Sequence, residues 1–180
     1  MNVPNALSGL RIALVPLFAW LYVRGSELAA FGVVLVAGAT DWLDGWLARK
    51  LGQVSELGKV LDPVADRVAV VAGGIVLVMR DAIWAPVAVA ILLRELVVSI
   101  GFFVLQARGY PRMEVSRIGK VATSVIFFGL AAGAAGSAFT NLGQQLKIIS
   151  TFVLVVGTAA YWLAGGLYMK EARRMTPVQN

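Results

Sequence analysis

The chain has 180 residues, of which 59% are hydrophobic, and it carries 16 Lys and Arg residues against 10 Asp and Glu residues. Soluble domains contain about 45–50% apolar residues, so this composition excludes an ordinary soluble domain and predicts a polytopic membrane protein. The chain has neither Cys nor His, which excludes disulfides, thiolate nucleophiles and His-based catalysis. Any bound metal would need oxygen ligands, and these favour Mg²⁺, Mn²⁺ or Ca²⁺.

The N-terminal residues 1–11 (MNVPNALSGLR) are too polar to cross a bilayer. They predict a short interfacial helix lying on the membrane surface, with a frayed terminus as the alternative. The first span is expected at Ile12–Val23. The next apolar run, Leu28–Thr40, is shorter than the roughly 20 residues that a span needs, so the second helix is expected to continue to about Leu51.

The rest of the chain predicts four further spans, separated by polar turns. The third is expected to begin near Glu56–Gly58 and to end at Met79, before a tight turn at Arg80 and Asp81. The later elements are a fourth span at Ile83–Leu105, a basic loop at Ala107–Lys120, a fifth span around Val121–Ala135, a loop at Gly136–Gln145 and a sixth span at Ile148–Met169. Gly129 and Gly133 are four residues apart, which favours close helix packing in the core or, alternatively, a dimer seam.

We therefore expect an all-α integral membrane protein with a single domain over residues 1–180. It would comprise an interfacial helix at 1–11, six transmembrane helices within 12–170 and a cytoplasmic tail at 171–180. Six spans place both termini on one side of the membrane. Eleven of the 16 Lys and Arg residues are expected there, Arg11 among them, whereas the opposite loops hold only Arg24, Arg80 and Lys147. By the positive-inside rule, that side is the cytoplasm.

Four Asp residues gather where the second span ends and the third begins: Asp41, Asp44, Asp62 and Asp66. Residues three or four apart share one face of a helix, and a short turn would bring the two helices antiparallel and side by side. The four carboxylates would then converge, as carboxylates do in helical bundles that hold metal pairs. The alternative is an ion network at the membrane edge with Arg49, Lys50, Lys59 and Arg67.

Small residues lie among these Asp residues. Gly45 and Ala48 follow Asp44, and Gly58 precedes Asp62, so a ligand could approach the backbone closely here. Arg49 lies one turn beyond Gly45 and could bind a phosphate through two nitrogens. Two divalent cations about 3.5–4 Å apart can hold a phosphoryl group and its leaving oxygen, so the stretch predicts phosphoryl-type transfer.

The same residues, at the same spacing, resemble the signature of the CDP-alcohol phosphatidyltransferase family. The match covers Asp41, Asp44, Gly45, Ala48, Arg49, Gly58, Asp62 and Asp66, and the resemblance extends to the N-terminal segment and the six-span layout. It implies a homodimeric membrane enzyme that transfers phosphatidyl from CDP-diacylglycerol to an alcohol and releases CMP. It also implies that the four Asp residues hold two Mg²⁺ or Mn²⁺ ions and that Asp66 is the catalytic base. Gly45, Ala48 and Gly58 would line the cytidine site, and Arg49 would contact the diphosphate.

The acceptor alcohol is predicted from a second set of residues. Arg94 in the fourth span, with Arg112, Arg117 and Lys120 around the following loop, would form an anionic acceptor pocket. Alternatively, this is a solvated basic loop that faces anionic lipid. Glu95 is adjacent to Arg94 in sequence and so would point elsewhere on the helix; it need not be the ionic partner that a buried Arg requires.

Within the family, this part of the chain resembles the branches that use glycerol-type acceptors. Phosphatidylglycerophosphate synthases usually carry a second Arg where Gly101, Phe102 and Phe103 stand here, and a second Lys where Ala122 stands. These two missing cations argue against binding of a phosphate dianion. The stretch is more similar to the CMP-forming cardiolipin synthases of actinobacteria, whose acceptor is phosphatidylglycerol. Glycerol 3-phosphate remains the alternative acceptor.

The expected location is the bacterial cytoplasmic membrane, with the active site and both termini on the cytoplasmic side. The expected partners are CDP-diacylglycerol, the acceptor, membrane lipid and a second copy of the chain, and no nucleic acid. A hypothesis from another functional class is a membrane protein without catalytic activity that binds a cation at the Asp residues, as a scaffold or transporter. It differs from the enzyme in predicting no CMP release.

Overall fold

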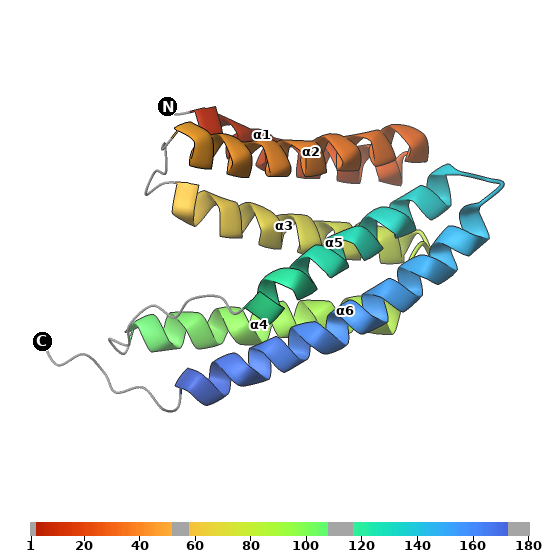
Figure 1. Cartoon of the computed structure of the whole chain (residues 1–180). Helices are drawn as coiled ribbons and strands as arrows, with labels where there is room; N and C mark the ends of the chain where they lie inside the picture. Colours follow the sequence, from red (N-terminus) through yellow and green to blue (C-terminus); the bar gives the residue numbers. More distant parts are fainter. Residues whose placement is uncertain (1–2, 52–57, 108–116, 173–180) are drawn as a thin grey trace, which may run out of the picture.

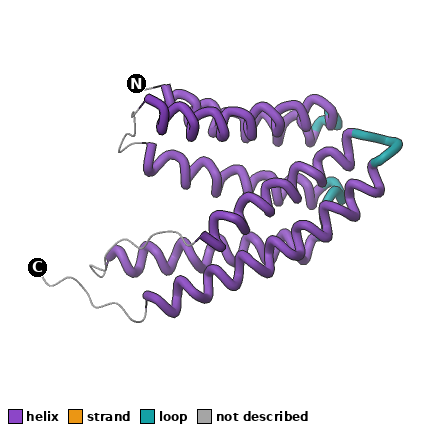
Figure 2. Tube along the Cα trace, viewed as in Figure 1, coloured by secondary structure: helices purple, strands orange, loops and turns teal. Residues whose placement is uncertain are grey.

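The computed structural model describes residues 3–51, 58–107 and 117–172 of the protein. These described residues form six α-helices and no strand (Figures 1 and 2). The all-α class expected from the sequence is thus confirmed. The helices are α1 (Val3–Val23), α2 (Glu27–Leu51), α3 (Gly58–Met79), α4 (Ala85–Ala107), α5 (Arg117–Ala138) and α6 (Gly143–Ala172).

The helices run up and down along one another. Figure 1 shows the α1–α2, α3–α4 and α5–α6 turns at one end of the bundle, and the start of α1 and the end of α6 at the other. Helix α1 packs against both α2 and α3, while α5 packs along α6 and also contacts α2 and α3. Below, the half of the bundle that carries the start of α1 is called its N-terminal end, and the end with the three turns is called the turn end.

Two of the predicted helix ranges are confirmed closely. Helix α2 runs on through Asp41 to Leu51, and α3 covers Gly58–Met79, as the sequence predicts. Helix α5 begins at Arg117 and α6 at Gly143, so both helices are longer than the apolar runs that predicted them. The expected basic loop falls mostly on residues 108–116, outside the described residues.

Helix α1 differs from the sequence expectation. It is one helix from Val3 to Val23, so the prediction of an interfacial helix that ends at Arg11 as a separate element is wrong. Pro4 lies in the first turn, where a missing N–H does no harm. Arg11 causes no break because its charge is compensated by two carboxylates from other helices.

Two of the turns end their helices by the same hydrogen-bond pattern. After α1, Gly25 has a φ of 79°, its N–H bonds to the carbonyl of Tyr22, and the Ser26 N–H bonds to that of Leu21. After α3, the residue with positive φ is Asp81, at 52°, with the equivalent bonds to Val78 and Leu77. Both are Schellman motifs, in which the left-handed residue is usually Gly. The tight turn predicted at Arg80 and Asp81 is therefore confirmed.

The core lies between α1 and α3 on one side and α5 and α6 on the other. Its buried side chains include Phe18, Val70, Leu77, Ile126 and Leu154. A Cβ built at Gly129 would lie 2.6 Å from Leu154 Cδ2, and one at Gly133 would lie 2.6 Å from Ile83 Cγ2. This glycine pair therefore serves internal helix packing, as predicted.

The outer surface of the bundle is apolar. Phe128, Phe152 and Leu163 are 74%, 70% and 68% exposed, and soluble monomers rarely expose such large apolar areas. Within the described part of the chain, two helical segments are long and apolar enough to cross a bilayer, Ile118–Ala138 and Gly143–Leu167, and Gly9–Val23 is a shorter apolar helix. These observations support a membrane protein, while the number of spans stays a prediction.

Candidate active site

Asp41 and Asp66 converge at the N-terminal end of the bundle, and a third residue holds them there. Arg11 Nη2 lies 2.7 Å from Asp41 Oδ1, and Arg11 Nη1 lies 3.0 Å from Asp66 Oδ1. The Arg11 side chain is 4% exposed, whereas those of Asp41 and Asp66 are 58% and 37% exposed. One buried guanidinium on α1 thus joins carboxylates from α2 and α3, which lie far apart in sequence.

The helix arrangement explains this geometry. Asp41 lies just past the middle of α2 and Asp66 in the third turn of α3. Among the described residues, the backbones of α2 and α3 do not approach each other closely, and α1 packs against both. The direct side-by-side packing expected for α2 and α3 is therefore absent from the described ranges. The two carboxylates nevertheless meet, because α1 provides the cation that both of them contact.

The remaining signature positions lie on the same two helices. Asp44, Gly45, Ala48 and Arg49 follow Asp41 on α2, and Gly58 and Asp62 precede Asp66 on α3. Their side chains lie outside the described residues. Helix spacing places Asp44 on the face of Asp41 and Asp62 on the face of Asp66. Among the side chains that are described, no group of three or more possible metal ligands occurs.

The donor set fits a hard divalent cation. Asp41 and Asp66 offer carboxylate oxygens only, and Mg²⁺ and Mn²⁺ prefer such ligands. Their Oδ1 atoms already share one cationic partner, the Arg11 guanidinium. Two carboxylates held this close repel each other unless a cation lies between them. The place where the two carboxylates meet therefore favours the binding of a cation.

A second polar cluster lies buried between α4 and α6. Arg94 and Glu95 are 9% and 5% exposed. Arg94 Nη1 lies 3.4 Å from Glu95 Oε1. Arg94 also contacts Tyr161 twice: its Nε donates to the backbone carbonyl oxygen, and its guanidinium stacks on the ring, 3.4 Å from the centroid. The Tyr161 hydroxyl donates to Glu95 Oε1, and Arg67 Nε on α3 lies 3.5 Å from Glu95 Oε2.

This cluster corrects the expectation for Glu95. The sequence argument had Glu95 pointing away from Arg94, yet the two side chains form an ion pair. The long Arg94 side chain reaches Glu95, and its guanidinium lies against the Tyr161 ring. The proposed acceptor role of Arg94 stays a prediction. Arg112 lies outside the described residues, the side chain of Arg117 is not described, and Lys120 is exposed in the first turn of α5.

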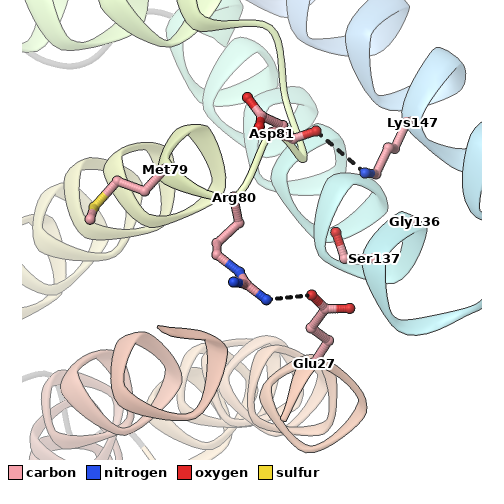
Figure 3. A pocket seen from close by; sticks show the side chains of 7 residues that line it. All are labelled: Glu27, Met79, Arg80, Asp81, Gly136, Ser137 and Lys147. Carbon is pink, nitrogen blue, oxygen red and sulfur yellow. Dashed lines mark hydrogen bonds and ion pairs between the residues drawn. The ribbon is translucent and has the colours of Figure 1, made fainter. Parts of the chain in front are cut away.

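The turn end carries a different polar site. A hollow of about 300 Å³ lies there. Figure 3 shows the residues that line it: Glu27, Met79, Arg80, Asp81, Gly136, Ser137 and Lys147. Arg80 Nη2 lies 3.3 Å from Glu27 Oε1, and Lys147 Nζ donates to the backbone carbonyl of Asp81 at 3.3 Å. These contacts tie α2 and α6 to the α3–α4 turn. They lie at the opposite end of the bundle from Asp41 and Asp66.

Sequence reasoning missed two residues of these sites, Arg11 and Glu95. From the sequence, Arg11 counts only among the cations on the cytoplasmic side. The signal that could have marked it is its place inside an otherwise helical run, since a cation near the middle of a membrane helix needs a carboxylate partner. Glu95 was set aside because adjacent residues point in different directions along a helix, but Arg94 is long enough to reach it.

Comparison with known proteins assigns the chain to a family. The family model described as CDP-alcohol phosphatidyltransferase matches residues 1–164. That range contains every residue of the Asp signature, Arg11 and the buried Arg94–Glu95 pair.

Three relatives are informative. The chain is 32% identical to a cardiolipin synthase (CMP-forming) of Streptomyces coelicolor, over 97% of this chain and 84% of that protein. It is 32% identical to a CDP-diacylglycerol–glycerol-3-phosphate 3-phosphatidyltransferase of Rickettsia typhi, over 93% of this chain and 98% of that protein. It is 42% identical to a Pseudomonas fluorescens protein of the latter description, over 55% of this chain and 53% of that protein.

Proposed function

The chain belongs to the CDP-alcohol phosphatidyltransferase family, and from that premise we propose that it transfers phosphatidyl from CDP-diacylglycerol to phosphatidylglycerol, forming cardiolipin and releasing CMP. The observation that carries the proposal is the convergence of Asp41 and Asp66, two residues of the family signature, at one end of the bundle. Had these carboxylates faced opposite ends, no common site for a diphosphate could exist.

Phosphatidylglycerol is favoured as the acceptor by two observations. The cardiolipin synthase of Streptomyces coelicolor matches this chain over 97% of its length. In addition, Ala122 stands at the position where phosphatidylglycerophosphate synthases usually carry a second Lys. Ala122 is 1% exposed. A Lys would not fit at this buried position without repacking, so the chain lacks the cation that would help to bind a phosphate dianion.

Glycerol 3-phosphate is the second candidate acceptor. It is favoured by the Rickettsia typhi relative, which is as similar to this chain as the cardiolipin synthase and is covered almost completely. Both acceptors present a primary hydroxyl on a glycerol unit, so the chemistry at the Asp site is the same for each. They differ in charge and in the size of the group behind the hydroxyl.

Two divalent cations, Mg²⁺ or Mn²⁺, are assigned to Asp41, Asp44, Asp62 and Asp66. When bound, they supply positive charge that neutralises the diphosphate and the departing CMP. Arg49, on the same helix as Asp41 and Asp44, contributes a fixed positive charge to the diphosphate. Gly45, Ala48 and Gly58 leave room for the cytidine against the backbone.

The acceptor hydroxyl needs a base, because an alcohol is a poor nucleophile until its proton is removed. Asp66 takes that role. The acceptor oxygen forms a bond to the β-phosphorus, the bond between this phosphorus and the CMP oxygen breaks, and the hydroxyl proton passes to Asp66. Before metal binds, Arg11 contacts Asp66 from the protein side. Because a nearby cation lowers the basicity of a carboxylate, Asp66 acts by orienting the hydroxyl and by partial proton transfer.

The acceptor is held by positive charge around α4 and α5, with Arg112, Arg117, Lys120 and Arg94 as the proposed contacts. The six helices cross the cytoplasmic membrane of a bacterium, with the Asp site at the inner leaflet. This orientation rests on the excess of Lys and Arg at the N-terminal end of the bundle and on the apolar outer surface. A homodimer is proposed from the family resemblance.

The acceptor can be tested directly. Purified protein is given labelled CDP-diacylglycerol and Mg²⁺ with either phosphatidylglycerol or glycerol 3-phosphate, and the lipid products are separated. Cardiolipin is expected with phosphatidylglycerol. Product from glycerol 3-phosphate alone would replace the first candidate by the second, and the absence of CMP release with every acceptor would favour a cation-binding protein without enzymatic activity.

A further inference from the structure

Arg11 occupies the place where the carboxylates of Asp41 and Asp66 meet. Each of its two terminal nitrogens contacts the Oδ1 atom of one Asp, at 2.7 and 3.0 Å. Arg11 is buried, and Asp41 is more than half exposed. The guanidinium therefore reaches the carboxylates from the protein side, while ions from outside can reach the Asp41 carboxylate.

Arg11 and a divalent cation would compete for these oxygens. A lone pair that accepts a short, charge-assisted hydrogen bond is not fully available to a metal ion. The guanidinium and the metal ion also repel each other, most strongly where little water separates them. Both arguments apply to the two Oδ1 atoms that Arg11 contacts.

From this competition we propose that Arg11 is a displaceable internal cation. While the site is free of metal, Arg11 holds Asp41 and Asp66 together and compensates their charge. When divalent cations bind, Arg11 leaves at least one of the two carboxylates. The inference rests on the proposed metal site, and Arg11 is a positioning residue, because it acts through the carboxylates rather than on the substrate.

This role links metal loading to helix α1. Arg11 belongs to α1, which packs against both helices that carry the Asp signature. Release of Arg11 loosens the connection between the middle of α1 and the site. The preformed ion pairs also reduce the repulsion between Asp41 and Asp66 before metal arrives.

The experiment measures Mn²⁺ binding to the purified full-length protein in detergent by electron paramagnetic resonance, without any substrate. Arg11→Met removes the charge and keeps the apolar stem. The matched control is Arg24→Met, in the turn directly after the same helix, because Arg24 is exposed and stacks on Trp20 at 4.9 Å from the ring centroid. Arg11→Met is expected to bind Mn²⁺ about tenfold more tightly than the wild type, and Arg24→Met is expected to match the wild type.

The thermal stability of the same variants gives a second readout. Without metal, Arg11→Met is expected to melt below the wild type, and Mn²⁺ should raise its Tm by more than it raises that of the wild type. An unchanged or weaker Mn²⁺ affinity in Arg11→Met overturns the inference and leaves the metal site standing. Failure of the wild type to bind Mn²⁺ overturns the metal site itself.

Should Arg11→Met fail to fold, the wild type can be tested by Arg-specific modification with phenylglyoxal, followed by mass spectrometry of the peptides. Arg11 is expected to react slowly without metal, because it is buried, and several-fold faster with saturating Mg²⁺. Arg80, which is 42% exposed at the turn end, is the internal reference and should react at one rate throughout. An Arg11 rate that does not change with Mg²⁺ overturns the displacement.

Discussion

The two ends of the bundle both join helices through an Arg and a carboxylate, but they do so differently. At the N-terminal end, Arg11 is 4% exposed and contacts two carboxylates at 2.7 and 3.0 Å. At the turn end, Arg80 is 42% exposed and contacts one carboxylate, that of Glu27, at 3.3 Å. Removing one partner of a fully buried pair costs about 3–5 kcal/mol and an exposed pair contributes about 0–1 kcal/mol; the Arg11 pairs, with a buried cation and carboxylates that are 58% and 37% exposed, lie between these limits.

This difference shows which end has a specialised role. The turn end has the composition of a structural tie, in which charges of both signs fix the α3–α4 turn to α2 and α6. The N-terminal end concentrates carboxylates beside a buried cation, which is costly unless the arrangement serves binding or catalysis. The following substitutions test that contrast, from the largest expected effect to the smallest.

The largest effect is expected for Asp66→Asn. Loss of the base should lower the rate of CMP release by about 10²–10⁴-fold, measured with labelled CDP-diacylglycerol and phosphatidylglycerol. The matched control is the same change at the turn end, Asp81→Asn, since Asn also tolerates the positive φ of that position. The control should keep the wild-type rate. Equal losses in both variants would break the contrast between the two ends.

Glu95→Gln tests whether burial, rather than position at either end, sets the stability of an ion pair. Glu95 is 5% exposed and contacts Arg94, Arg67 and the Tyr161 hydroxyl. Its neutralisation leaves the buried Arg94 without a counter-charge, which should cost about 3 kcal/mol of unfolding free energy. Thermal melting in detergent measures the effect. Glu27→Gln is the partly exposed counterpart and should cost under about 1 kcal/mol. A similar fall in Tm for both variants would contradict the burial argument.

Asp81→Gly should stabilise the turn end by about 0.5–1 kcal/mol. Asp81 has a φ of 52°, a conformation that Gly adopts without the steric cost of a Cβ. The Tm is expected to rise with no change in the rate of CMP release. A fall in Tm would show that the Asp81 side chain stabilises the turn in a way that outweighs backbone strain.

The smallest effect is expected from a double-mutant cycle on Arg80 and Glu27. With Arg80→Met and Glu27→Gln, the coupling free energy should be about 0.2–1 kcal/mol, because both side chains are partly exposed. Measured by thermal or chemical unfolding, a coupling of several kcal/mol would show that this pair is as important to the fold as the buried ones.

Much of the fold could be predicted from the sequence, because membrane spans need a minimum length. That requirement extended the second helix through Asp41 to Leu51 and placed Asp62 and Asp66 in the third, as the structure shows. The prediction of a separate interfacial helix that ends at Arg11 was wrong for a physical reason. The charge of Arg11 is compensated by Asp41 and Asp66, 30 and 55 positions away, and no local pattern in the sequence contains that information.

The site was predictable in part. The spacing of the four Asp residues indicated convergence, and the structure brings Asp41 and Asp66 together. It could not be predicted that α1 supplies the contact between them. Likewise, an intramembrane Arg94 was expected to need a partner, but the choice of Glu95 depends on the Tyr161 ring, which α6 brings beside it.

The most direct test of the account is CMP release from CDP-diacylglycerol by the purified wild type, in the presence of phosphatidylglycerol and as a function of Mg²⁺ concentration. We predict that CMP and cardiolipin appear in equal amounts, that chelation of divalent cations stops the reaction and that added Mg²⁺ or Mn²⁺ restores it. Release of CMP at an undiminished rate in chelator, or no release under any condition, would contradict the assignment of Asp41, Asp44, Asp62 and Asp66 to a metal-dependent active site.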